Sequence, residues 1–172
     1  MLMRFLYGLV YKIAAVFFNI LNLLLFGNLP PFGCACTIVE EQGRFLVVKR
    51  GNNYTFPGGY MRWREHPTQT ARREGFEETG LRLKIGELIG YHSADSSSPL
   101  HMSTLILAFN GSVIGGELRD SIEGRAIWVD EAELQSKLTI HYRHLFERYS
   151  TMRAQTQSQD APVASEQSSK SR

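Results

Sequence analysis

The apolar residues of the chain gather first in one long run near its N-terminus. Most side chains between Phe5 and Gly27 are Leu, Phe, Val, Ile or Ala, and the interruptions are Lys12, Asn19 and Asn22. A helix of this length, at ~1.5 Å per residue, is about 35 Å long, enough for the ~30 Å hydrocarbon core of a bilayer. The Pro-Pro pair that follows would end it. The pattern therefore predicts one hydrophobic N-terminal helix.

The polar and small residues of this run fall on one side of the helix. At 100° per residue they form a single stripe, made of Arg4, Gly8, Tyr11, Lys12, Ala15, Asn19 and Asn22. Mid-membrane lysine costs about 2.5–3.5 kcal/mol, but Lys12 lies near one end, where it can reach the interface. We predict that residues 1–31 are a membrane-spanning anchor. The alternatives are a helix lying in the headgroup region and a helix that packs on its own domain or forms a homodimer.

Shorter apolar runs rich in β-branched residues predict the strands of a compact domain that follows. The first two form a hairpin around Glu41-Gln42-Gly43, and Asn110-Gly111 and Gly115-Gly116 predict turns further along. The predicted strands are 34–40, 43–49, 82–93, 101–109 and 125–129. A sheet of several strands is therefore expected between residues 32 and 150.

Two segments close the chain. A helix is predicted from Asp130 to about Tyr149, because Asp130 and Glu133 have the spacing of a capping box. Residues 151–172 are rich in Ser and Gln and contain no aromatic residue. Such a segment cannot bury enough surface to fold, so we predict a disordered polar tail.

One predicted helix carries a cluster of carboxylates. Glu74, Glu77 and Glu78 are spaced i, i+3 and i+4, which makes their side chains neighbours on one helical face. Like charges so placed repel one another unless a cation lies between them. Hard divalent cations, above all Mg²⁺, take oxygen ligands. The spacing therefore predicts a metal site on this helix.

The ends of this helix are legible in the sequence. Pro67 suits its first position, His66 is then near the N-cap, and Gly80 suits the left-handed residue after its last turn. Arg73 can pair with Glu77 one turn later, and Glu65 can hold Arg73 from the preceding loop.

The residues from Gly59 to Leu81 resemble the signature of the Nudix hydrolases. The matching positions are Gly59, Glu65, Arg73, Glu74, Glu77, Glu78, Gly80 and the hydrophobic Leu81. At ordinary residue frequencies, the seven fixed matches at one given start arise by chance about once in 10⁸. One position departs from the pattern, because Gly75 stands where the family has a hydrophobic residue. Either Phe76 supplies the missing contact, or the helix packs unusually close to its neighbour.

The resemblance implies a fold and a set of site residues. The expected fold is α/β, a Nudix-type α/β/α sandwich around a mixed sheet over residues 32–150, preceded by the hydrophobic helix. The resemblance assigns metal binding to Glu74, Glu77 and Glu78, with Glu74 a candidate general base. It also implies that a backbone carbonyl of the Gly58-Gly59 turn, above all that of Gly58, helps bind the metal. It completes the catalytic set with Arg73 and Glu65 as positioning residues. The implied cofactor is Mg²⁺, with Mn²⁺ as an alternative.

Other residues are weaker candidates for the site. Some members of the family take the base from a distant loop, here Glu117, Asp120 or Glu123. Aromatic residues that could stack on a base are Tyr54, Phe56, Tyr60, Trp63 and Tyr91, and arginines that could contact phosphates are Arg50, Arg62 and Arg64. One of His92 and His101 could act in acid–base chemistry. The pair His141 and His144 is more typical of a surface or core feature.

Composition adds little to this picture. The net charge of +2 gives no reason to expect a nucleic acid as partner. The two cysteines, Cys34 and Cys36, are too few for a disulfide scaffold and are better explained as part of a strand.

The predicted function is Mg²⁺-dependent hydrolysis of a phosphoanhydride bond in a nucleoside diphosphate derivative or a nucleoside triphosphate. The alternative is a nucleotide-sensing module that has the same fold and does not hydrolyse its ligand. We expect a membrane-tethered domain that faces the cytoplasm, where nucleotides are, with a soluble cytoplasmic protein as the alternative.

Overall fold

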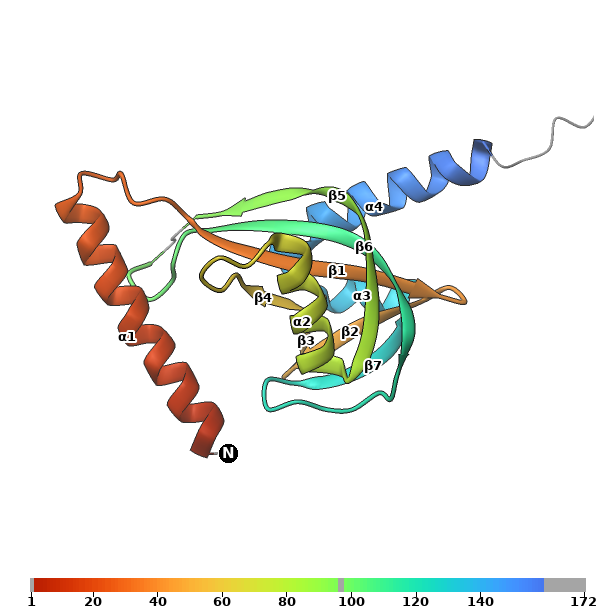
Figure 1. Cartoon of the computed structure of the whole chain (residues 1–172), viewed down its shortest axis with the longest axis horizontal. Coiled ribbons are helices and arrows are strands. Elements are labelled where there is room, and N and C mark those ends of the chain that lie inside the picture. Colours follow the sequence, from red (N-terminus) through yellow and green to blue (C-terminus); the bar gives the residue numbers. More distant parts are fainter. Residues whose placement is uncertain (1, 96–97, 160–172) are drawn as a thin grey trace, which may run out of the picture.

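The structure is a computed structural model that describes residues 2–95 and 98–159 (Figure 1). Its helices are α1 (Leu2–Leu24), α2 (Pro67–Thr79), α3 (Glu131–Lys137) and α4 (Ile140–Gln159). Its strands are β1 (Phe32–Glu41), β2 (Arg44–Arg50), β3 (Asn53–Thr55), β4 (Gly58–Tyr60), β5 (Leu81–Ala94), β6 (Thr104–Gly116) and β7 (Arg125–Asp130).

The strands form one mixed sheet in the order β3-β2-β1-β6-β5, with β4 paired to β1 and β7 paired to β2. β1 runs parallel to β6 and antiparallel to β2 and β4. The predicted hairpin is present, and its turn residues Gln42 and Gly43 have φ angles of +52° and +72°. The sequence prediction of a mixed sheet is confirmed.

Alternate residues of β1 show how the layers are arranged. Ala35 packs with Ala71 of α2, whereas Cys36 belongs to the core cluster that contains Leu145 and Phe146 of α4. Because neighbouring strand residues point to opposite faces, α2 and α4 cover opposite faces of the sheet (Figure 1). The predicted α/β/α arrangement is confirmed.

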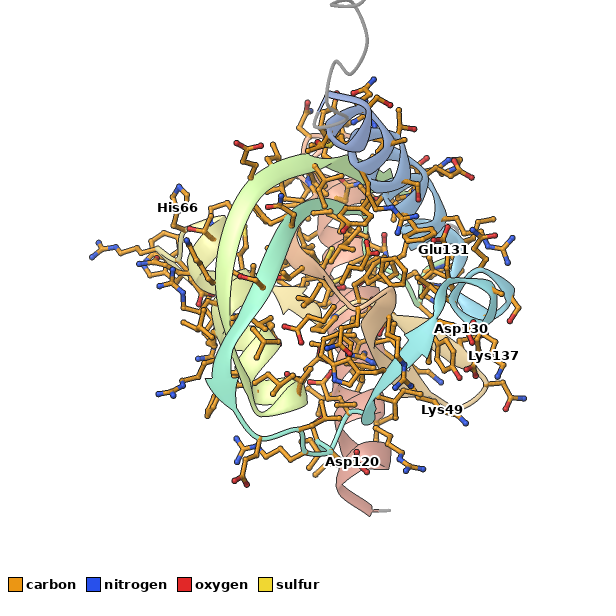
Figure 2. All side chains as sticks on the ribbon, turned by 90° about the vertical axis from the view of Figure 1, so that its right-hand side faces the viewer. Lys49, His66, Asp120, Asp130, Glu131 and Lys137 are labelled. Carbon is orange, nitrogen blue, oxygen red and sulfur yellow. The ribbon has the colours of Figure 1, made fainter. Side chains whose placement is uncertain are left out.

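Charged side chains surround this core. Figure 2 shows Lys49, His66, Asp120 and Lys137 projecting outward from different sides of the domain. Apolar side chains such as Phe45 fill the interior, where they are fully buried. The central strands β1 and β2 are buried along consecutive residues, which is the pattern of strands covered on both faces of a sheet.

Helix α2 begins and ends where the sequence predicts. His66 is its N-cap, and its ring accepts a hydrogen bond from the amide of Thr68, while the side chain of Gln69 accepts one from the His66 amide. Gly80 follows the last turn with φ +74°. Gly75 is buried, and a Cβ atom there would lie 2.5 Å from Cδ1 of Leu83. Close packing thus explains the departure from the family pattern, since Phe76 is largely exposed.

One predicted turn is wrong. Asn110 and Gly111 lie inside β6, which continues to Gly116. The side chain of Asn110 accepts a hydrogen bond from the amide of Glu87, where the β5–β6 register shifts. A Cβ atom at Gly111 would lie 2.5 Å from a methyl carbon of Thr37, so this glycine serves close packing.

The predicted last helix is two helices. Asp130 caps α3 as predicted, accepting a hydrogen bond from the Glu133 amide at 2.7 Å. The chain then breaks because Leu138 is buried and the amide of Thr139 donates to the carbonyl of Tyr54 at 3.1 Å.

Helix α4 also extends further than predicted. The sequence predicts a disordered tail over 151–172, but α4 continues to Gln159, and residues 160–172 lie outside the described residues. Arg153 explains the difference, because its guanidinium pairs with Glu40 at 2.9 Å and Glu131 at 2.7 Å. Met152 packs against the core beside it.

The N-terminal helix is present, but its predicted role needs correction. No helix in the described part of the chain combines the length and the apolar character needed to cross a membrane. The polar stripe of α1 instead contacts the domain. Asn19 donates to the carbonyls of Pro99 at 3.1 Å and His101 at 3.0 Å, and the ring of Phe18 lies 4.7 Å from that of Phe32.

Candidate active site

Helix α2 places the three glutamates at different depths. Glu78 is only 2% exposed, whereas Glu77 is 45% exposed and Glu74 lies between these extremes. The predicted neighbouring positions on one helical face are therefore present, and the face is turned toward the interior at Glu78.

A partly buried ion pair connects the helix to the loop before it. Arg73 donates to both carboxylate oxygens of Glu65 at 2.8 Å, and the hydroxyl of Thr70 and the amide of Arg62 also donate to Glu65. The hydrogen bonds from Arg73 lower the pKa of Glu65 to about 2. Arg73 also donates to the carbonyl of Tyr60 at 3.1 Å. The predicted contact between Glu65 and Arg73 is thus present and positions the Gly58-Gly59 pair.

Arginines neutralise the glutamates of α2. Arg73 pairs with Glu74 at 2.6 Å and with Glu77 at 3.0 Å, and Arg62 pairs with Glu77 at 3.1 Å. Burial raises the pKa of Glu74. Among the residues that the structure describes, no three His, Cys, Asp or Glu side chains already converge as a metal site.

Glu78 lies deepest in the site. One of its carboxylate oxygens accepts a hydrogen bond from the amide of Gly58 at 2.9 Å, and the other pairs with Arg50. Arg50 also pairs with Glu123 at 2.9 Å. Burial raises the pKa of Glu78 to about 7, although Arg50 and the Gly58 amide oppose the shift.

The sequence predicts a turn at Gly58-Gly59, but both glycines lie in strand β4, and close packing requires both of them. A Cβ atom at Gly58 would lie 2.5 Å from the carbonyl oxygen of Ala35 in β1. A Cβ atom at Gly59 would lie 2.6 Å from the carboxylate of Glu74. The start of β4 therefore brings its backbone directly against the carboxylates of α2.

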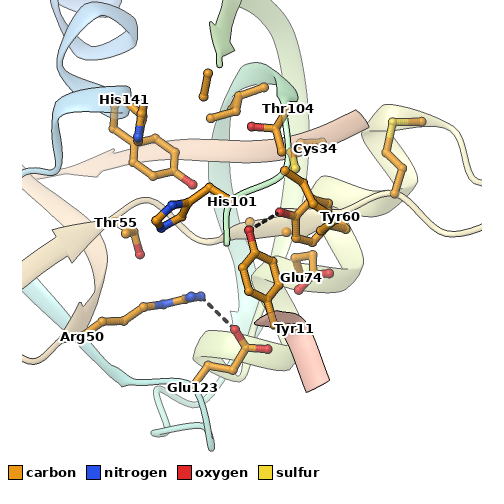
Figure 3. Close-up of a pocket in the computed structure, with 18 of the residues that line it drawn as sticks. Tyr11, Cys34, Arg50, Thr55, Tyr60, Glu74, His101, Thr104, Glu123 and His141 are labelled. Carbon is orange, nitrogen blue, oxygen red and sulfur yellow. Dashed lines mark hydrogen bonds and ion pairs between the residues drawn. The ribbon is translucent and has the colours of Figure 1, made fainter. Parts of the chain in front are cut away.

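A cavity of about 860 Å³ opens beside these residues (Figure 3). Tyr11, Arg50, Glu74 and His101 come from different segments and point toward the same space in Figure 3. Its lining includes Gly8, Tyr11 and Lys12 of α1, Arg50, Gly58, Gly59, Tyr60, Arg62, Arg73, Glu74, Glu77, His101, Glu123, His141 and Tyr142. The volume is that of a pocket for a small organic ligand.

Some of the weaker candidate residues line the cavity and others do not. Glu123 lines it, while Glu117 and Asp120 are not among its lining residues. Arg50 and Arg62 also line it, as do His101 and His141, whereas Arg64, His92 and His144 do not. Of the five aromatic candidates only Tyr60 lines it. Tyr54 and Phe56 belong to the core, and Trp63 and Tyr91 are exposed.

Sequence reasoning did not assign Tyr11, Lys12 or Tyr142 to the site. Tyr11 and Lys12 lie in α1, more than forty residues before Gly58-Gly59, and Tyr142 lies in α4. The polar stripe on α1 was the one sequence signal that included Tyr11 and Lys12. The stripe does not specify which part of the chain it contacts.

Comparison with known proteins now decides the family. The family profile described as "NUDIX domain" matches residues 30–149. The chain belongs to the Nudix hydrolase family. It is therefore a pyrophosphohydrolase.

Two curated relatives are 32% and 28% identical to this chain over the aligned residues. A "MutT-like protein" from Streptomyces ambofaciens is 32% identical over 111 residues, which cover 63% of this chain and 69% of the relative. An "ADP-ribose pyrophosphatase" from Methanocaldococcus jannaschii is 28% identical over 118 residues, which cover 65% of this chain and 69% of the relative.

Solved structures share the Nudix fold. A Nudix hydrolase from Nitrosomonas europaea superposes with a TM-score of 0.64 at 24% identity, covering 72% of this chain and 90% of that one. A MutT protein from Methanosarcina mazei gives 0.63 at 21% identity, covering 73% and 97%. At these identities the likeness establishes the fold alone.

Proposed function

We propose that this Nudix protein is a Mg²⁺-dependent hydrolase of a nucleoside diphosphate derivative or a nucleoside triphosphate, acting in the cytoplasm where such nucleotides are. The observation that carries the proposal is the packing of Gly58 and Gly59 against the glutamates of α2, at the wall of one cavity. A phosphoanhydride placed in that cavity would lie beside both carboxylates and arginines.

The donor set fits a hard divalent cation, on which Nudix members typically depend. Glu74, Glu77 and Glu78 offer only oxygen donors, and Gly59 leaves clearance for the Glu74 carboxylate. These glutamates, with the backbone of Gly58-Gly59, would hold Mg²⁺ or Mn²⁺. When bound, such a cation neutralises pyrophosphate oxygens and lowers the pKa of a coordinated water. It would compete with the arginines that now occupy the same carboxylates.

The other groups of the site supply positive charge and a proton acceptor. Arg50 and Arg62 line the cavity and can stabilise charge on phosphate oxygens. Glu74 is the first candidate for the general base, because burial raises its pKa toward the working pH. Glu123 is the second, since it reaches the same cavity from the segment before β7. Glu65 and Arg73 hold the loop and helix in register.

Turnover by wild type and Glu78→Gln tests the proposal. The panel comprises nucleotide sugars, ADP-ribose, dinucleotides and nucleoside triphosphates, each with Mg²⁺ or Mn²⁺. We expect Glu78→Gln to lose roughly a hundredfold or more in kcat while its circular dichroism spectrum is unchanged. Glu87→Gln, an exposed change on β5, is the matched control and should behave as wild type.

The results separate the hydrolase from its alternative. Full activity in Glu78→Gln would contradict the metal-ligand role. Tight nucleotide binding without turnover in wild type, across both metals, would favour the nucleotide-sensing module.

The outer face of α1 supports a second part of the proposal, association with another copy of this chain. Six of its exposed apolar residues follow one another at spacings of three and four, and each of the six is 55% to 68% exposed. This apolar seam consists of Leu6, Val10, Ile13, Phe17, Ile20 and Leu24. It is about 27 Å long and has the 3.5-residue period by which two helices pack side by side. We propose that a second α1 covers this seam.

A further inference from the structure

Helix α1 precedes the Nudix domain in sequence but supplies one wall of its active-site cavity. Gly8, Tyr11 and Lys12 line the cavity together with Glu74 and Glu77 of α2. The two helices thus face the same space, the first with a cation and the second with carboxylates. Figure 3 shows Tyr11 of α1 and Glu74 of α2 at this space.

Direct contacts fix this wall in place. The hydroxyl oxygens of Tyr11 and Tyr60 are 3.2 Å apart, and Tyr60 directly follows Gly58-Gly59 in β4. About two turns further along α1, the side-chain amide of Asn19 donates hydrogen bonds to two carbonyls of the loop before β6. The helix is therefore held to the domain both at β4 and at the loop across the cavity.

Packing explains neither Gly8 nor Lys12. A glycine inside a helix costs about 1 kcal/mol relative to alanine, yet a Cβ atom at Gly8 would meet nothing within 4 Å. Lys12 is exposed, and no ion pair of its ammonium is found among the described residues. Arg50, Arg62 and Arg73, the arginines of the same lining, are all paired with glutamates. Lys12 is thus a cation of the cavity that no residue in the described part of the chain neutralises.

We propose that α1 is a substrate-binding wall in which Lys12 binds an anionic group lying beyond the phosphoanhydride that is cleaved, and Gly8 leaves room for that group. The inference rests on the proposed function and narrows its substrate class. The favoured ligands are nucleoside polyphosphates, or nucleoside diphosphates whose second moiety carries its own phosphate. A nucleoside diphosphate joined to a neutral sugar has nothing to offer Lys12.

Equilibrium binding to the full-length protein tests this wall. The probes are α,β-methylene-ATP and α,β-methylene-ADP-ribose, which share adenosine and resist cleavage but differ in the charge of their distal group. Isothermal titration calorimetry with Mg²⁺ compares wild type, Lys12→Met, Lys12→Arg and Gly8→Leu. Lys84→Met, which removes an exposed lysine of β5 outside the cavity, is the matched control.

We expect Lys12→Met to weaken α,β-methylene-ATP binding about tenfold, the value of one charge-assisted hydrogen bond. The same change should leave α,β-methylene-ADP-ribose nearly unaffected, and Lys12→Arg should restore binding. The salt dependence of α,β-methylene-ATP binding should become shallower in Lys12→Met, because one ionic contact is lost. Gly8→Leu should weaken both probes by filling the space beside Lys12, and Lys84→Met should weaken neither.

Turnover measured on the same variants distinguishes a failure of the substrate-binding role of α1 from a failure of the proposed hydrolase function. Equal effects of Lys12→Met on both probes, or no effect on either, would contradict the proposed role of α1 in substrate binding. Turnover by wild type in the same experiment would still support the proposed hydrolase. Wild type that neither binds nor hydrolyses a nucleotide would overturn the proposed function and this inference together.

Discussion

Glu65 shows how one side chain outside the helix organises the site. It accepts both hydrogen bonds from Arg73, one from Thr70 and one from the amide of Arg62. Arg73 in turn bonds the carbonyl of Tyr60, directly after Gly58-Gly59. The residue spacing alone suggested the Glu65–Arg73 pair, and its consequence for β4 appears only in the folded chain.

This ion pair predicts how stability depends on pH. The hydrogen bonds from Arg73 lower the pKa of Glu65 from 4.5 to about 2. A lowered carboxyl pKa contributes stability that is fully present above pH 4.5 and is lost as the pH falls toward 2. We expect Glu65→Gln to lose about 3 kcal/mol of unfolding free energy at pH 7 and to show a flatter acid limb, measured by urea unfolding at successive pH values. Glu87→Gln is the control, and identical acid limbs in Glu65→Gln and wild type would refute the assignment.

Helix α2 shows how packing decides what a helical sequence tolerates. Gly75 replaces the hydrophobic residue of the family pattern and lies against Leu83, at the start of β5. The helix can approach the strand closely only because no Cβ atom stands between them. The unusual residue is therefore explained by the neighbouring strand and has no direct role in the chemistry.

This contact predicts that Gly75→Ala destabilises the protein. The gain in helix propensity is about 1 kcal/mol, but the new Cβ atom would overpack against buried Leu83, so we expect a net loss of about 1–2 kcal/mol in urea unfolding. Leu83→Ala in the same chain should relieve the clash, so the two changes should be non-additive in a double-mutant cycle. Gly8→Ala is the control, because its Cβ atom meets nothing within 4 Å and should not destabilise. Strict additivity of the Gly75 and Leu83 changes would refute the close-packing account.

At the scale of the whole molecule, helix α1 has two faces with different surroundings. One face docks on the domain through Asn19, Phe18 and Tyr11, and it contributes Lys12 to the cavity. The opposite face is the apolar seam, which nothing in the described part of the chain covers. Large exposed apolar surfaces of this kind mark sites of association.

The seam predicts a dimer of the whole protein. We expect wild type to sediment as a dimer at micromolar concentration, and Ile13→Glu with Ile20→Glu to sediment as a monomer with an unchanged kcat per chain. Ile114→Glu, which places the same charge on an exposed isoleucine of β6, is the control and should stay dimeric. A monomeric wild type would refute the dimer, and if it also floats with phosphatidylcholine–phosphatidylglycerol vesicles, the seam belongs to a lipid surface.

The sequence by itself determined helix α2 and the character of the sheet. The i, i+3, i+4 spacing of Glu74, Glu77 and Glu78 and the residues that end α2 are local properties, because neighbours on a helix are fixed by the chain's own geometry. Apolar runs rich in β-branched residues, with the turn residues between them, likewise predicted the hairpin and most strands.

Only the tertiary structure decided which distant residues complete the site and how the terminal helices are used. Tyr11, Lys12 and Glu123 reach the cavity through contacts between segments far apart in sequence. The polar stripe of α1 was visible in the sequence, but a stripe does not specify its partner, and Asn19 finds that partner in the loop before β6. In the same way Arg153 extends α4 because Glu40 of the hairpin lies within reach, a contact that no local pattern encodes.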